Sequence, residues 1–294
     1  MTDPIKDCFL CTGLADTKEH IIPQWLQKHF SLSNQKLGLW NDTVLLYRQA
    51  LIPLCKNCNG NILSRLENRV QSNSATEADY FLWALKIRFL LSLKDTTLQL
   101  DRTNPGKGKL MESEVALVGQ QFVKHALTNF DKTNFIFRPN PFGTVLVFDN
   151  HIKDGEFGFA DIPHPYWGLT ISLPDNKILS VLFSDRGLVR KEILKDYKNK
   201  GGLKNYCKEL PATTTNELIR QIMLKLLLKQ YQIKNIPYGV SLSDTGIFSK
   251  DIPKSVNYRK KLKKEVLVDI SQILKLDRKF GDELYNSLPT HYKG

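Results

Sequence analysis

Four cysteines occur in two pairs of the same spacing, Cys8-x-x-Cys11 and Cys55-x-x-Cys58. Each pair can supply two thiolates from one tight turn, and four thiolates suit the tetrahedral coordination of a structural zinc ion. The amino-terminal sequence MTDPIKDCFL has no positively charged segment followed by an apolar run, so we expect a reducing compartment and metal ligation rather than disulfides. The fifth cysteine, Cys207, stands alone and is expected to be a free thiol. The sequence therefore predicts a closed, structural zinc site.

Three further residues around the cysteine pairs could do chemistry. Glu19 and His20 follow the first pair, and Asn59 comes directly after the last cysteine. Carboxylate and amide oxygens are hard ligands of the kind that Mg²⁺ and Mn²⁺ bind. A neutral imidazole, with an ordinary pKa of about 6.5, can take a proton from an attacking water at neutral pH. Adjacent side chains on an extended segment point to opposite sides, so a bend would be needed to aim Glu19 and His20 at one phosphodiester.

This order of residues resembles that of the HNH, or ββα-metal (His-Me finger), endonucleases, especially the zinc-stapled branch of the recombination endonuclease VII type. The resemblance covers roughly residues 8 to 70. It implies that Glu19 and Asn59 bind a catalytic Mg²⁺ or Mn²⁺, and that His20 is the general base. Pro23 falls where such motifs often read His-hydrophobic-x-Pro.

The chain departs from the family pattern at two places. Glu19 stands where many members have Asp or His, and its longer side chain would have to fold back to hold the ion. The helix after the second cysteine pair also lacks the His that many members carry. Side chains that could substitute for it are Asn61, Glu67 and Asn68.

The resemblance implies a metal-dependent endonuclease that hydrolyses DNA phosphodiester bonds, in a defence, restriction or mobile-element setting. The alternative is a zinc-stapled nucleic-acid-binding or adaptor protein without catalysis. The two hypotheses differ in whether the protein cleaves DNA with a divalent ion and whether binding survives the loss of Glu19 and His20. A module with one active site cuts one strand, so double-strand cleavage would need a homodimer, a larger assembly or two successive nicks.

The charge of the chain favours a polyanionic partner. The formal net charge is +12 and the isoelectric point is near 9.4, which favours phosphate backbones. We expect DNA as the partner and no membrane, because no stretch reaches the roughly 18 to 20 apolar residues that span a bilayer, and we expect a cytoplasmic protein. A dense basic run is the predicted site of phosphate contact: Arg259, Lys260, Lys261, Lys263 and Lys264.

Hydrophobic periodicity predicts an α+β fold. The small zinc-stapled ββα-metal module should be followed by a helical pair, an antiparallel β-sheet and C-terminal helices. The S-x-x-E spacing of Ser74 and Glu77 predicts a capping box at the start of the first helix. Further helices are expected over residues 114–129, from 213–215 to 233, and near 280–288, with short strands between 135 and 184. We expect two domains, a nuclease module over residues 1–72 and an α+β domain over residues 73–294 that serves recognition, sensing or partner binding.

Overall fold

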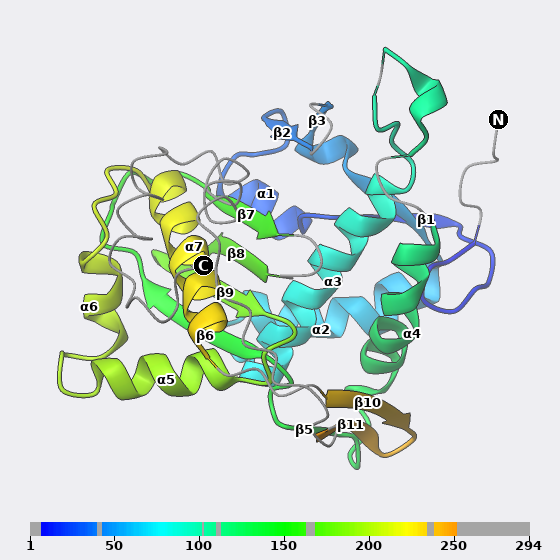
Figure 1. Cartoon of the computed structure of the whole chain (residues 1–294). Coiled ribbons are helices and arrows are strands. Elements are labelled where there is room, and N and C mark those ends of the chain that lie inside the picture. Colours follow the sequence, from blue (N-terminus) through cyan, green and yellow to red (C-terminus); the bar gives the residue numbers. More distant parts are fainter. Residues whose placement is uncertain are drawn as a thin grey trace. The chain divides into compact units, whose positions relative to one another are not determined.

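The chain forms two compact units that combine helices with antiparallel sheets, which confirms the α+β class (Figure 1). This computed structural model describes residues 7–39, 43–101, 103–109, 113–162, 168–233 and 238–251. The first unit comprises Met1–Phe137 and Leu242–Ile247, and the second comprises Arg138–Ser241 and the residues from Phe248 on. The domain boundary that we expected at residue 72 falls inside the first unit.

The first unit begins with two antiparallel strands followed by a helix. Strand β1 (Thr17–His20) pairs with β4 (Leu51–Leu54), and Glu19 lies opposite Ile52. Because directly paired residues share a face of the sheet, Glu19 and Ile52 both point into the core, where they are buried. The π-helical turn η2 (Cys58–Leu63) then leads into helix α2 (Ser64–Gln71).

The segment between β1 and β4 consists of short elements. They are helix α1 (Gln24–His29), strands β2 (Lys36–Gly38) and β3 (Val44–Leu46), which pair antiparallel, and the 3-10 turn η1 (Tyr47–Gln49).

The predicted helical pair is present as α3 (Glu77–Asp95) and α4 (Ser113–Asn129), which pack together, with the 3-10 turn η3 (Pro105–Lys107) between them. The predicted position of the capping box was wrong. Thr76, not Ser74, caps α3: its side chain accepts from the backbone N–H of Asp79 at 3.2 Å, and the Asp79 carboxylate accepts from the Thr76 N–H at 2.9 Å. The hydroxyl of Ser74 lies instead 2.9 Å from that of Ser72 at the end of α2.

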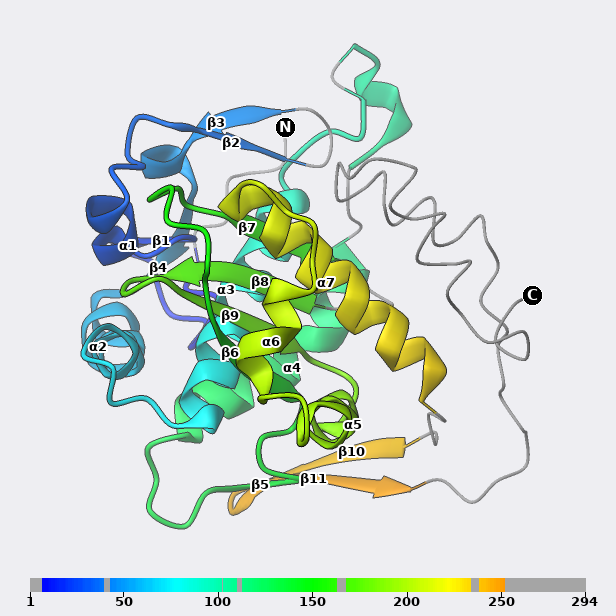
Figure 2. The ribbon, with the colours of Figure 1, turned by 90° about the vertical axis from the view of Figure 1, so that its left-hand side faces the viewer.

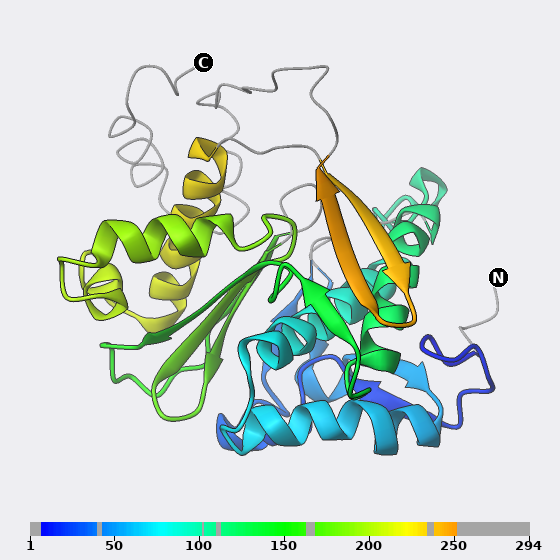
Figure 3. The same ribbon diagram turned by 90° about the horizontal axis from the view of Figure 1, so that it is seen from below.

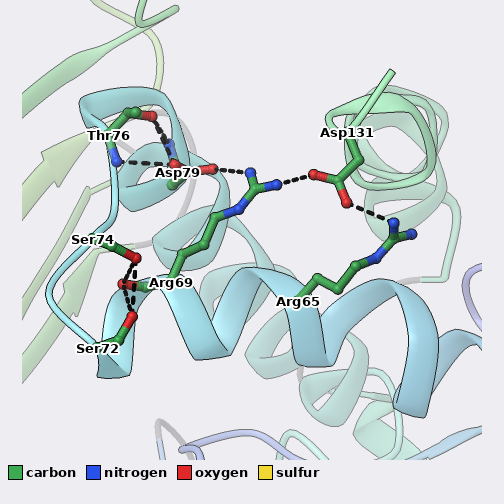
Figure 4. A network of polar contacts seen from close by, with 7 residues as sticks. All are labelled: Arg65, Arg69, Ser72, Ser74, Thr76, Asp79 and Asp131. Carbon is green, nitrogen blue, oxygen red and sulfur yellow. Dashed lines mark hydrogen bonds and ion pairs between the residues drawn. The ribbon is translucent and has the colours of Figure 1, made fainter. Parts of the chain in front are cut away.

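An arginine on α2 connects this helix to the helical pair (Figure 4). The guanidinium of Arg69 donates to Asp79 at 2.9 Å and also forms an ion pair with Asp131, just beyond the end of α4. Arg65, one turn earlier, contacts the second oxygen of Asp131 at 2.8 Å, with its own side chain 56% exposed. Since both carboxylates are largely buried and Arg65 is not, Arg69 is the stronger link.

Replacing Arg69 with methionine is therefore expected to lower the free energy of unfolding by about 2 kcal/mol, because hydrogen bonds to charged groups are lost. Arg65→Met is the matched control and should cost less than about 1 kcal/mol, as exposed ion pairs do. Urea denaturation of both variants measures the difference. Equal losses would contradict the assignment of Arg69 as the main link.

The second unit contains the predicted antiparallel sheet, with strand order β6-β9-β8-β7. The strands are β6 (Thr144–Asp149), β7 (Phe159–Ile162), β8 (Gly168–Leu173) and β9 (Lys177–Leu182). Helix α7 (Thr215–Gln232) crosses this sheet (Figure 2). Thr214 caps this helix, since its side chain accepts from the backbone N–H of Glu217 at 3.2 Å.

Helices α5 (Leu188–Tyr197) and α6 (Leu203–Lys208) were not predicted. They have only ten and six residues, so each offers fewer than three turns of apolar pattern. Their buried residues Ile193 and Tyr206 nevertheless join α7 and the sheet in one hydrophobic core.

Strands β10 (Tyr238–Ser243) and β11 (Gly246–Asp251) form a hairpin, and β11 lies beside β5 (Ile136–Arg138) (Figure 3). This hairpin was not predicted from the sequence. Its tip belongs to the first unit, where the N–H of Ile136 donates to the carbonyl of Thr245 at 3.0 Å. The helix expected near residues 280–288 lies outside the described residues.

Candidate functional site

The two cysteine pairs come together as predicted. The ligand atoms of Cys8, Cys11, Cys55 and Cys58 all lie within 4.8 Å of one another, and the Cys11 and Cys55 sulfurs are 3.6 Å apart. Zinc–sulfur bonds of about 2.3 Å in a tetrahedron place the sulfurs roughly 3.8 Å apart. The four thiols can therefore hold a metal ion such as zinc, with all four coordination positions taken by protein.

Each cysteine pair is shaped by its own backbone. In the first pair the N–H of Cys8 donates to the carbonyl of Gly13 at 2.7 Å, which closes a compact loop. In the second, the N–H of Cys58 points to the Cys55 sulfur at 3.4 Å, and the N–H of Asn59 donates to the Cys55 carbonyl at 3.0 Å. The second pair is thus the first turn of the helix that continues into α2.

Hydrogen bonds lower the pKa of one of these thiols, that of Cys8. Burial raises the pKa of Cys8, but backbone hydrogen bonds from Cys55, Cys11 and Leu10 outweigh this and lower it to about 7. For Cys58 burial is the main cause and raises the pKa. A bound metal ion would favour the thiolate at every one of the four positions.

Asn59 lies against strand β1. Its side-chain nitrogen donates to the hydroxyl of Thr17 at 3.3 Å and to the carbonyl of Lys18 at 3.4 Å. The N–H of Lys56 donates to the carboxylate of Asp16 at 2.7 Å, which also joins the start of this helix to the strand. The structure thus places Asn59 beside the strand that carries Glu19 and His20.

His20 is the last residue of β1 and is half-buried. Burial lowers the pKa of its imidazole; the charge of Glu19 raises it, and that of Lys86 lowers it further, for a net decrease. A lowered pKa keeps the ring neutral at neutral pH. His20 is therefore in the protonation state that a general base requires.

Glu19 is held by a buried lysine of helix α3. Its oxygen Oε1 accepts from the ammonium of Lys86 at 2.6 Å, and the same ammonium contacts the carboxylate of Glu67 on α2. The Lys86 side chain is 0% exposed. Burial alone would lower the pKa of Lys86, but the two carboxylates reverse this and raise it. Lys86 is therefore a charged group in the interior.

This arrangement does not fit a divalent ion held by Glu19, because the carboxylate already accepts from the ammonium of Lys86. Asn59 contacts the strand through its amide nitrogen, which is not a ligand atom. Within the described ranges, the four cysteines form the only cluster of three or more His, Cys, Asp or Glu ligands, and Glu19, His20 and Glu67 do not form another. The Mg²⁺ or Mn²⁺ site stays a prediction without structural support.

The sequence analysis missed Lys86. Its signal is the composition of α3, which is apolar on nearly every side and is buried over most of its length. A lysine inside such a helix must be paired, because an unpaired buried charge is very costly. Glu67 had been considered only as a substitute ligand.

An open pocket of about 590 Å³ lies between α1 and α2. Glu67 lines it and so connects the buried lysine to the surface of the first unit. The other lining residues are Gln24, Trp25, Lys28, His29 and Gln71.

The predicted phosphate-binding residues Arg259 to Lys264 lie outside the described residues, so that prediction remains open. In the part of the chain that the structure describes, every helix is too short or too polar to cross a bilayer. No protein-family model matches the chain, and no curated protein and no solved structure is significantly similar to it.

Proposed function

We propose that this protein is an HNH-type endonuclease that hydrolyses DNA phosphodiester bonds, with zinc as the ion of the four-cysteine site. The observation that carries the proposal is the ββα arrangement: antiparallel β1 and β4 are followed by a helix whose first turn holds two of the cysteines and contacts β1 through Asn59. The half-buried His20 ends β1 in this arrangement.

His20 is proposed as the general base. Its neutral imidazole would take a proton from water while the water oxygen bonds to phosphorus. The bond between phosphorus and the 3′ oxygen would then break, and the leaving 3′ oxygen would take a proton from solvent. Asn59 and Lys86 act on other parts of the module: Asn59 fixes the helix start against β1, and Lys86 fixes the carboxylate of Glu19 on the core side of that strand. The family resemblance adds a requirement for Mg²⁺ or Mn²⁺, but Glu19 is already paired with Lys86, so the requirement is left to measurement.

Replacing His20 with alanine is expected to slow plasmid nicking by about 10²- to 10⁴-fold, the usual contribution of a general base. The matched control is His151→Ala, which removes an exposed histidine of the second unit and should leave the rate unchanged. Purified zinc-loaded protein is assayed with Mg²⁺, with Mn²⁺ and with both removed by a weak chelator. Equal nicking by His20→Ala and the parent would exclude His20 as the base.

The alternative function is a zinc-stapled module that binds nucleic acid or a protein partner without catalysis. The ion pair between Glu19 and Lys86 favours it, because this pair uses the predicted metal ligand for structure. It predicts salt-sensitive DNA binding that survives His20→Ala, and no cleavage with any divalent ion. Tight binding without cleavage by the unmodified protein would replace the endonuclease proposal with this one.

The setting of the activity is part of the proposal as well. A cytoplasmic restriction, defence or mobile-element nuclease would meet foreign DNA, and the net charge of +12 favours contact with its backbone. Sedimentation with and without DNA tests whether a homodimer forms, which would allow both strands to be cut.

A further inference from the structure

Three elements far apart in the sequence meet at one lysine. Glu19 comes from β1, Glu67 from α2 and Lys86 from α3, and the lysine ammonium contacts both carboxylates. Two ionised carboxylates in the interior repel each other, and each is costly to remove from water without a cation. The lysine supplies that cation for both carboxylates, so the three side chains form one electrostatic unit.

Solvent reaches this group of three side chains at the Glu67 carboxylate but not at Lys86. The Lys86 side chain is 0% exposed, whereas that of Glu67 is 17% exposed and lines the pocket between α1 and α2. A hydrated ion in the solvent-filled pocket could therefore reach Glu67. At Glu67 this ion would find both carboxylates already paired with the ammonium of Lys86.

The ammonium also takes up the space that such an ion would need. Its nitrogen lies 2.6 Å from Glu19 Oε1, which matches the upper end of the roughly 2.3–2.6 Å of Ca²⁺–oxygen bonds and is about 0.5 Å longer than Mg²⁺–oxygen bonds. Lysine and a divalent ion would thus compete for the same carboxylate oxygens.

We propose that Lys86 is the resident cation of the Glu19–Glu67 pair, and that it joins β1 to α2 and α3 while excluding a divalent ion from this place. Lys86 is a positioning residue: it fixes the carboxylate of Glu19, the residue before His20 in β1, without touching a substrate. The inference goes beyond the proposed endonuclease function, because it concerns ion binding by the protein alone and holds whether or not DNA is cleaved.

The test is a Mn²⁺ titration of the full-length, zinc-loaded protein without nucleic acid. The concentration of free Mn²⁺ is measured by electron paramagnetic resonance at each step. The unmodified protein is expected to bind no Mn²⁺ at the carboxylate pair. Lys86→Met removes the charge but keeps a side chain of similar length, so it should create a Mn²⁺ site. The double variant Lys86→Met, Glu67→Gln should lose that site again, because one of the two carboxylates is gone.

A second readout is thermal unfolding. Added Mn²⁺ should raise the unfolding temperature of Lys86→Met, because an ion that binds only the folded state stabilises it. It should not raise that of the unmodified protein or of the double variant. Both measurements report binding, so their outcome is independent of the nuclease assay.

Two results would overturn the inference. One is a folded Lys86→Met protein that binds no Mn²⁺. The other is Mn²⁺ binding by the parent protein that is lost in Glu67→Gln, which would show that the lysine does not exclude the ion. This result needs no lysine variant, so it can be obtained even if Lys86→Met fails to fold.

Discussion

Replacing Cys55 with serine is expected to release the metal ion and to unfold the amino-terminal part of the first unit. Structural zinc sites contribute about 10–16 kcal/mol of apparent binding free energy at neutral pH, and this energy appears as folding energy. The strands of this region have only three or four residues each, and the second cysteine pair starts the helix that continues into α2. Without the ion, the two cysteine loops lose their shared ligand, and the hydrogen bonds of Lys56 to Asp16 and of Asn59 to β1 remain as links between these segments.

Metal content by mass spectrometry and limited proteolysis of the first 70 or so residues measure this effect. The matched control is Cys207→Ala, which removes a buried thiol of the second unit that belongs to no ligand cluster. It should keep the full metal content and cost only about 1 kcal/mol, the typical effect of a point mutation. If Cys55→Ser kept both the metal and its resistance to protease, the cysteine cluster would have no structural role.

Replacing Lys86 with methionine is expected to lower the free energy of unfolding by about 3–5 kcal/mol when no divalent ion is present. This is the usual cost of removing one partner from a buried ion pair, because the remaining charge stays buried without compensation. Here two carboxylates, Glu19 and Glu67, would remain. Urea denaturation of the zinc-loaded protein in the presence of a weak Mg²⁺ and Ca²⁺ chelator measures the loss.

Helix α3 offers a matched control for this variant in Lys94. Burial and the charge of Lys18 lower the pKa of Lys94, so its charge is mildly unfavourable in the folded protein. Lys94→Met should therefore change the free energy of unfolding by less than about 0.5 kcal/mol. Equal losses for the two variants would mean that lysine-to-methionine exchange in α3 destabilises for reasons other than the carboxylate pair.

The four-cysteine cluster could be predicted from the sequence because its geometry is local. A Cys-x-x-Cys spacing places two sulfurs on one turn, and a shared ion then needs only that two such turns meet. The helix over Glu77–Asp95, the strands between residues 136 and 182 and the α+β class followed in the same way from periodicity. Short elements such as α5, α6 and the β10–β11 hairpin were missed, because runs of six to ten residues give only a weak periodic signal.

Asn59 directly follows Cys58 along the chain, so its place at the second cysteine turn could be predicted from the sequence. The partner of Glu19 depends on how distant elements pack. Its partner Lys86 is 67 residues away, and no local pattern connects the two. A buried carboxylate takes whichever cation the packing of β1, α2 and α3 brings to it, because inside the protein an unpaired charge is too costly to leave.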